Sequence, residues 1–352
     1  MSTIVLTGGG TAGHIIPNLA LIPYLKEHFD NIVYIGSNTG LEQQLLEPFP
    51  EVKYYPITTV KLLRSLSPKN LLIPFKLHQG KREAVEIMRQ VEPDIIFSKG
   101  GFVSLPVTFA GKKLGIPMVC HESDLTMGLA NRLGSRHCCA VCTTFRETAD
   151  RLDNGLFVGS PYQKQEYSSE QITRLKQKLN LESGKPICLI TGGSQGAQNI
   201  NDIVLKNLDY LLKTHQVIHL TGRGKMNNTK KAGYHSLDYT HELGLMMSIA
   251  DVAITRGGSN ALYELLSYGV PMLIIPLHHG SRGDQEQNAM YFEKKGYGIA
   301  LFEPEMNDAT FIQNYNKLLQ SAPAIRSANK FAAPTDSLQR IMSTILKYRK
   351  VQ

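Results

Sequence analysis

Glycine-rich turns mark the places in this sequence where phosphate or sugar chemistry is most expected. Gly8-Gly-Gly-Thr-Ala-Gly-His14 follows an apolar run in the first half, and Gly192-Gly-Ser-Gln-Gly-Ala197 follows a similar run in the second half. Each turn would present backbone N–H groups at the start of a helix, where anions bind favourably. A single glycine often serves only to let the chain turn tightly, but recurrence at equivalent strand ends favours ligand binding.

A carboxylate follows a third turn of this kind. The segment Arg256-Gly-Gly-Ser-Asn-Ala-Leu-Tyr-Glu264 places an acid about two turns into a helix that begins at the loop. The two oxygens of Glu264 suit it to accept hydrogen bonds from the two hydroxyls of a ribose. The alternative is a solvated helix residue, but leucines on both sides favour a functional role.

Two common nucleotide-binding motifs are incomplete. Gly8, Gly10 and Gly13 match the dinucleotide fingerprint, which also needs an acid about 20 residues later, at the end of the second strand. That strand ends in Tyr34-Ile-Gly-Ser-Asn38, which has no acid. The Gly-Lys pairs at 111, 184 and 224 lack the Ser or Thr of the triphosphate loop. A dinucleotide oxidoreductase and a P-loop enzyme are therefore disfavoured.

The composition is that of a globular protein of about two domains. Among 352 residues, 42% are hydrophobic, and 38 Lys and Arg against 30 Asp and Glu give a net charge of +8. This charge suits an anionic partner: a phosphate-bearing small molecule, nucleic acid or an acidic lipid surface. No apolar run reaches the ~18 residues that span a bilayer, and no basic leader with a cleavage site is apparent. We expect neither a membrane span nor secretion.

The cysteines indicate packing rather than metal binding. Five cysteines in apolar stretches fit a reducing cytoplasm. His137 stands beside Cys138, Cys139 and Cys142, but no second ligand pair follows at zinc-finger spacing. We expect residues 138–145 to form one buried strand in which cysteine acts as a small apolar residue, without a metal site.

Short apolar runs alternate with longer amphipathic ones along the whole chain. This alternation predicts parallel sheets covered by helices on both faces, an α/β doubly wound architecture. Helices are expected over 18–29 and 81–91. Strands are expected over 3–7, 31–35, 94–97, 117–121, 186–191, 216–220, 252–255 and 271–276.

Six motifs in order resemble the MurG family of N-acetylglucosaminyltransferases, which make the peptidoglycan precursor lipid II. They are the two turns above, the Arg256 to Glu264 segment, Lys99-Gly-Gly-Phe-Val-Ser104, His121-Glu-Ser-Asp124 and Asp284-Gln-Glu-Gln-Asn-Ala289. The resemblance implies a GT-B fold, with two facing Rossmann-like domains and a cleft between them. We expect an acceptor and membrane domain over 1–160, a UDP-GlcNAc domain over 161–335, and a C-terminal helix over 336–352 that packs back on the first.

The resemblance also carries roles onto particular residues. The acceptor pyrophosphate and GlcNAc would meet Thr11, Ala12, Gly13 and His14. The donor uracil, ribose and pyrophosphate would meet Ser194, Gln195, the backbone near Thr240, Arg256, Glu264 and Gln285. Two departures stand out: Glu122-Ser-Asp124 replaces the usual Glu-Gln-Asn, and Gln163 precedes Lys164 where the family commonly has Arg.

Two features of the residues agree with this family. No Asp-x-Asp occurs in the chain, so we expect the departing UDP to be stabilised without a metal, by loop N–H groups and positive side chains. Residues 60–82 contain six basic residues and no acid, interleaved with leucines and Phe75. This composition is typical of a segment that lies on an anionic lipid surface. A buried helix with a basic solvated face is the alternative.

The sequence therefore predicts a hexosyltransferase that moves GlcNAc from UDP-GlcNAc, with inversion, to the 4-hydroxyl of MurNAc in undecaprenyl-pyrophosphoryl-MurNAc-pentapeptide. His14 is the first candidate for the base, because an ordinary imidazole titrates near pH 6.5. Glu122 and Asp124 are alternatives. We expect peripheral attachment to the cytoplasmic side of the membrane and no nucleic-acid partner. A related GT-B transferase with another lipid acceptor, or a UDP-GlcNAc 2-epimerase, remains the second interpretation.

Overall fold

The computed structural model divides the chain into two compact units. Unit 1 contains Met1–Gln163 and Asp336–Gln352, and unit 2 contains Lys164–Thr335. The structure describes every residue except 61–71, 163, 194, 280–281, 330–331, 333 and 351–352. Gln163, Ser194 and most of the basic segment that precedes residue 72 therefore lie outside the described residues.

Unit 1 is built on a parallel sheet. Its strands run in the order β3-β2-β1-β4-β5-β6-β7, the order of a doubly wound fold. Their bounds are β1 (Thr3–Thr7), β2 (Asn31–Ser37), β3 (Val52–Ile57), β4 (Ile95–Ser98), β5 (Met118–Glu122), β6 (Ala140–Thr143) and β7 (Gly155–Phe157).

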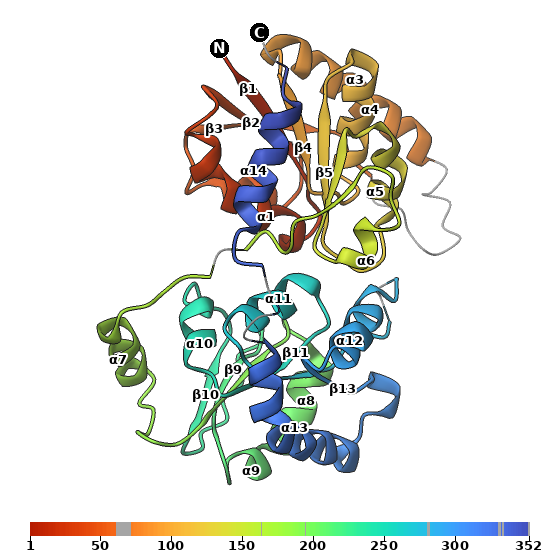
Figure 1. Cartoon of the computed structure of the whole chain (residues 1–352). Coiled ribbons are helices and arrows are strands. Elements are labelled where there is room, and N and C mark those ends of the chain that lie inside the picture. The colour runs from red at the N-terminus through yellow and green to blue at the C-terminus, as the bar shows by residue number, and fades with distance from the viewer. Residues whose placement is uncertain are drawn as a thin grey trace. The chain divides into compact units, whose positions relative to one another are not determined.

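Helices cover both faces of this sheet. Alternate residues of β1 enter different cores: Ile4 and Leu6 join one, and Val5 joins the other. The first core includes α1 and the C-terminal helix α14, which lie side by side in Figure 1, and the second includes α3 and α4. The helices are α1 (Ala12–Leu25), α2 (Glu42–Leu46), α3 (Ile73–Val91), α4 (Ser104–Leu114), α5 (Leu129–Gly134), α6 (Arg146–Ala149) and α14 (Ser337–Tyr348), with a 3₁₀ turn η2 (Ser135–His137).

Unit 2 repeats this architecture with strands in the order β10-β9-β8-β11-β12-β13, all parallel. One face packs on α8 and α13. The strands are β8 (Ile187–Thr191), β9 (Gln216–Leu220), β10 (Tyr234–Leu237), β11 (Val252–Thr255), β12 (Met272–Ile274) and β13 (Gly298–Ala300). The helices are α7 (Ser169–Lys178), α8 (Gln198–Lys206), α9 (Leu208–Leu211), α10 (Leu243–Ile249), α11 (Ser259–Ser267), α12 (Asp284–Lys294) and α13 (Asp308–Asn329), with a 3₁₀ turn η3 (Glu303–Glu305).

The expected fold class is confirmed, and some expected bounds are wrong. The first helix begins at Ala12 rather than at 18, because α1 accommodates Pro17 and Pro23 within it. The cysteine-rich strand is shorter than expected: β6 starts at Ala140, and the preceding residues 135–137 form a 3₁₀ turn. Among the described helices, none has both the length and the apolar character needed to cross a bilayer.

Candidate functional site

In unit 1, the register of three strands brings the expected acceptor residues to one edge of the sheet. Thr7 at the end of β1 is level with Ser98 of β4, which is level with Cys120 of β5. The segments that follow these strands carry His14, Lys99 and Asp124. Because parallel strands end at the same edge, these loops share it, as ligand loops do in open α/β sheets.

The buried side chain of Glu42 binds the first glycine turn. The N–H of Gly10 donates to Glu42 Oε1 at 3.0 Å, and Ser37 Oγ donates to Glu42 Oε2 at 3.2 Å. Gly10 has φ of 86°, a conformation that favours glycine. Thr11 is exposed, and Ala12 and Gly13 open α1. The turn therefore presents the start of a helix at the surface, where an anion can approach.

His14 lies against the second glycine turn of this edge. Its Nδ1 is 2.9 Å from Thr11 Oγ1. Gly101 has φ of 80°, and a Cβ atom there would lie 3.3 Å from His14 Nδ1 and 2.3 Å from the carbonyl oxygen of Gly9. Glycine at 101 thus lets the loop after β4 approach both the first turn and the imidazole.

Glu122 organises the loop that carries Asp124. Its carboxylate is buried and accepts hydrogen bonds from the N–H of Asp124 at 3.0 Å, the N–H of Gly128 at 2.9 Å and Asn131 Nδ2 at 3.0 Å. Burial, with the Asp124 charge, raises the pKa of Glu122. Asp124 itself is partly exposed. These contacts favour Asp124 over Glu122 for direct contact with a substrate.

In unit 2, the strand register assembles the expected donor residues in the same way. Thr191 of β8 is level with Thr255 of β11, and Thr255 is level with Ile274 of β12. The loops beyond these ends carry Gln195, which is exposed, and Arg256. Thr240 follows β10 and accepts from the N–H of Glu242 through Oγ1 at 2.9 Å.

Two further donor candidates stand on helices that start at this edge. Gln285 in the first turn of α12 accepts from the N–H of Leu277 at 3.0 Å. Glu264 is in α11, and burial raises the pKa of its carboxyl to about 7. The residue is half-buried, and no described side chain donates a hydrogen bond to that carboxyl. An acceptor in this state is well suited to two ligand hydroxyls.

Arg256 is engaged by a residue that the sequence did not single out. Its Nη1 lies 2.5 Å from Glu303 Oε1 and 3.2 Å from the carbonyl oxygen of Ile275. Glu303 also accepts from the N–H of His278 and from Asn199 Nδ2, both at 2.9 Å. Although burial opposes ionisation, these hydrogen bonds lower the pKa of Glu303. Glu303 lies far from Arg256 in sequence, so no local pattern could identify it.

The other expected positions have simpler surroundings. Lys164 places Nζ 5.4 Å from the ring centroid of Tyr268, a cation–π contact.

Within the described residues, no group of three or more His, Cys, Asp or Glu side chains is arranged to hold a metal ion. All five cysteines are free, and only Cys139 is exposed.

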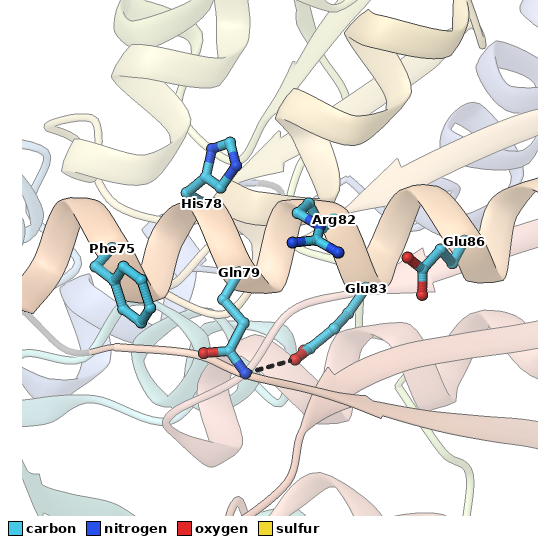
Figure 2. A pocket seen from close by; sticks show the side chains of 6 residues that line it. All are labelled: Phe75, His78, Gln79, Arg82, Glu83 and Glu86. Carbon is cyan, nitrogen blue, oxygen red and sulfur yellow. Dashed lines mark hydrogen bonds between the residues drawn. The ribbon is translucent and has the colours of Figure 1, made fainter.

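The first turn of α3, which belongs to the basic segment, exposes an apolar side chain. Phe75 is 71% exposed, while Ala84, Val85 and Met88 on the opposite face of the helix are buried. A pocket of about 420 Å³ lies along α3. Figure 2 shows the side chains that line it, which follow one another along this helix. The pocket is lined by Phe75, His78, Gln79, Arg82, Glu83 and Glu86. Glu83 is bound to the backbone N–H and hydroxyl of Thr58.

The fold and these two edges define the class of GT-B glycosyltransferases. The model of the glycosyltransferase family 28 N-terminal domain matches residues 4–143, and that of the family's C-terminal domain matches residues 187–344. The crystal structure of Acinetobacter baumannii MurG has a TM-score of 0.77 at 22% identity, covering 99% of this chain and 100% of that one. The calicheamicin glycosyltransferase CalG4 has a TM-score of 0.74 at 12% identity, with 99% and 98% covered.

Relatives over the full length define the family more narrowly. A protein of Clostridium kluyveri is 41% identical over 99% of this chain and 100% of its own length. A protein of Lachnospira eligens is 41% identical over 98% and 99%. Both are named UDP-N-acetylglucosamine--N-acetylmuramyl-(pentapeptide) pyrophosphoryl-undecaprenol N-acetylglucosamine transferase. The chain belongs to glycosyltransferase family 28 and, within it, to the MurG family.

Proposed function

We propose that this enzyme transfers GlcNAc from UDP-GlcNAc to the 4-hydroxyl of MurNAc in lipid I and so forms lipid II of peptidoglycan synthesis. The observation that carries the proposal is the 41% identity, over nearly the whole chain, to transferases whose names state this donor and acceptor. The two loop edges described above agree with it, since one offers glycine turns at a helix start beside an imidazole and the other a half-buried carboxyl.

The donor is assigned to unit 2. Glu264 accepts from the two ribose hydroxyls, and the uracil lies against the backbone at Thr240. Ser194, Gln195, Arg256 and Gln285 complete the contacts with the nucleotide and its pyrophosphate. Arg256 then exchanges part of its contact with Glu303 for the anionic donor. The leaving UDP is stabilised by these positive and N–H groups, without a metal cofactor.

The acceptor is assigned to unit 1. Thr11, Ala12 and Gly13 bind its pyrophosphate at the start of α1, and His14 takes the proton from the 4-hydroxyl. A bond forms between the acceptor oxygen and the anomeric carbon of GlcNAc while the bond from that carbon to the diphosphate oxygen breaks. One such displacement inverts the anomeric configuration. Asp124 is the second candidate for the base, and Glu122 orders its loop.

The lipid acceptor requires attachment to a membrane. We assign residues 1–160 to the acceptor and to an anionic cytoplasmic surface, residues 161–335 to the donor, and residues 336–352 to the support of the first domain. Gln163 and Lys164, at the junction, are assigned to phosphate contact. The exposed Phe75 and the basic residues around it support peripheral attachment through α3. A nucleic-acid partner is not part of the proposal.

The test is a transfer assay with the purified full-length chain, UDP-GlcNAc and a lipid I analogue, in the presence of a chelator. We expect a product heavier by one GlcNAc residue and an equal amount of UDP, with a β-linkage by NMR. A parallel reaction without acceptor is the control. UDP release in that control together with N-acetylmannosamine would show a 2-epimerase instead, and transfer only to a lipid lacking MurNAc would show another acceptor class.

A further inference from the structure

A lysine ammonium is buried at the edge of unit 1 without an assigned role. Lys99 directly follows β4 and is 1% exposed. Its backbone N–H donates to the carbonyl oxygen of Thr7 at 2.8 Å. This bond holds the backbone of Lys99 beside the first glycine turn. Because an isolated charge in the interior costs several kcal/mol, a buried ammonium needs hydrogen-bond acceptors and negative charge nearby.

The hydrogen-bond acceptors are His121 and Ser123. Lys99 Nζ lies 2.9 Å from His121 Nδ1 and donates to Ser123 Oγ. His121 Nε2 is 3.3 Å from the carbonyl oxygen of Gly159, which can only accept, so Nε2 carries the hydrogen and Nδ1 accepts from Lys99. Burial, and then the Lys99 charge, place the pKa of His121 well below its ordinary value. His121 is therefore neutral and supplies no counter-charge.

The negative charge comes from Glu122 and Asp124, the two residues that flank Ser123. Glu122 Oε1 accepts from the backbone N–H of Asp124, so the turn that contains Ser123 closes on the buried Glu122 carboxylate. Burial lowers the pKa of Lys99 to about 8, while Glu122, Asp124 and, more weakly, the thiols of Cys120 and Cys142 oppose that shift. Glu122 is buried and accepts from three donors. Asp124 is partly exposed, so a substrate can reach its side chain.

We propose that Lys99 is a positioning residue for Asp124. The ammonium holds the turn through Ser123 and balances the charge of the Asp124 carboxylate, so that a carboxylate can occupy a position where the family usually has an amide. The short Ser123 and the charged Asp124, the two departures in His121-Glu-Ser-Asp124, thus belong together with Lys99 as one charge-balanced unit. The assignment of Asp124 to the sugar-facing edge rests on the proposed function.

The test is a double-mutant cycle with Lys99→Met, Asp124→Asn and both changes together. Lys99→Met should lower kcat/KM for transfer by about tenfold or more and leave UDP affinity unchanged, because the nucleotide is assigned to unit 2. Adding Asp124→Asn should restore at least part of that loss. Lys113→Met, at an exposed lysine of α4 in the same unit, is the matched control. A double variant no better than Lys99→Met overturns the pairing.

A second measurement keeps the proposal testable should Lys99→Met fail to fold. Asp124→Asn changes a partly exposed side chain, and in that variant the titration of Lys99, followed by NMR of ¹³C-labelled lysine, should move to lower pH. An unchanged titration overturns the pairing. If the Lys99 titration moves while the wild-type chain transfers no GlcNAc to lipid I, the pairing stands and the proposed function is wrong.

Discussion

His14 Nδ1 lies 2.9 Å from Thr11 Oγ1. The proposed base role requires the tautomer in which Nδ1–H donates to that hydroxyl and Nε2 accepts the proton. We predict that His14→Ala lowers kcat by about 10²- to 10⁴-fold with nearly unchanged UDP affinity, because a general base acts only in the transition state. Steady-state kinetics and UDP calorimetry check this.

His28→Ala, at an exposed histidine of the same unit, serves as the control for His14. If His14 only binds the acceptor phosphate, the main defect of His14→Ala will be a raised KM for lipid I. The base role would then pass to Asp124.

The raised pKa of Glu264 predicts a conflict between stability and binding. The pKa of Glu264 is about 7 in the folded chain against an ordinary 4.5, so the fold favours the protonated carboxyl. The free energy of unfolding should therefore fall as pH rises from 4.5 through 7. Glu264→Gln should therefore raise the free energy of unfolding at pH 8 by about 2 kcal/mol, with little effect at pH 5. Urea unfolding followed by circular dichroism measures this difference, and Glu166→Gln is an exposed control in the same unit.

The ionisation of Glu264 should also control the affinity for UDP-GlcNAc. Ribose hydroxyls donate to the ionised form, so wild-type affinity for UDP-GlcNAc should rise as pH increases from 6 to 8. Glu264→Gln should weaken binding about tenfold or more and remove that pH dependence. A variant that binds UDP-GlcNAc as the wild type does at pH 8 would remove Glu264 from the donor site.

At the scale of elements, a chain of hydrogen bonds ties β9 and β10 to α8. Asn201 Nδ2 donates to the carbonyl oxygen of Thr221, so its Oδ1 accepts from His219 Nε2 at 3.1 Å. His219 Nδ1 then accepts from the hydroxyl of Tyr234 at 2.9 Å, and that hydroxyl accepts from Asn227 Nδ2 at 2.7 Å. The chain requires a neutral imidazole, because each bond fixes the direction of the next.

This requirement predicts a loss of stability in acid. Burial lowers the pKa of His219 to about 4, so its contribution is complete above the ordinary pKa of 6.5 and is lost as pH falls toward 4. The contribution amounts to about 3 kcal/mol across that window. His219→Gln should flatten the dependence of the unfolding free energy of unit 2 on pH between 6.5 and 4. His241→Gln, at an exposed site, should not, and equal slopes in wild type and His219→Gln would contradict the prediction.

How far the sequence predicted the elements depended on burial. The strands β1, β9 and β11 are fully buried, and the bounds predicted from their largely apolar runs agree with the structure at both ends. The edge strand β3 has exposed and half-buried residues, and three of the four residues of β10 are half-buried, so neither strand has a clear apolar run. Short β13 contains a glycine and only three residues. These strands are formed by pairing with neighbours rather than by local preference.

The candidate site could be proposed from the sequence where a glycine-rich turn leads into a helix that carries a polar side chain, as with His14 and Glu264, and these roles stay predictions. Lys99 lies within one of the motifs, but lysine side chains are normally exposed, so the sequence alone does not predict that it is buried. The pairing of β4 with β5 brings it to His121 and Ser123. The partnership of Arg256 with Glu303 crosses 47 residues of sequence. Contacts that depend on strand order in this way have no local pattern.

At the scale of the whole molecule, the two units have separate hydrophobic cores, and our proposal gives them different tasks. It assigns the acceptor to unit 1, which also carries the exposed start of α3, and the donor to unit 2. Because α14 returns to the core of unit 1, the chain ends on the same unit in which it begins. A membrane contact through α3 would therefore attach the acceptor unit directly to the surface that holds the lipid.

That attachment leads to a prediction for Phe75. Transfer of its exposed ring into lipid should contribute about 1.5 to 3 kcal/mol, so Phe75→Ser should weaken binding to phosphatidylglycerol-containing vesicles about tenfold to a hundredfold. Met226→Ser, at a side chain 60% exposed on unit 2, should have no effect. Added salt should weaken the binding of all three proteins, because the basic residues near α3 attract the anionic surface. Vesicle sedimentation measures each case, and equal binding by Phe75→Ser and wild type would exclude the start of α3 as the membrane contact.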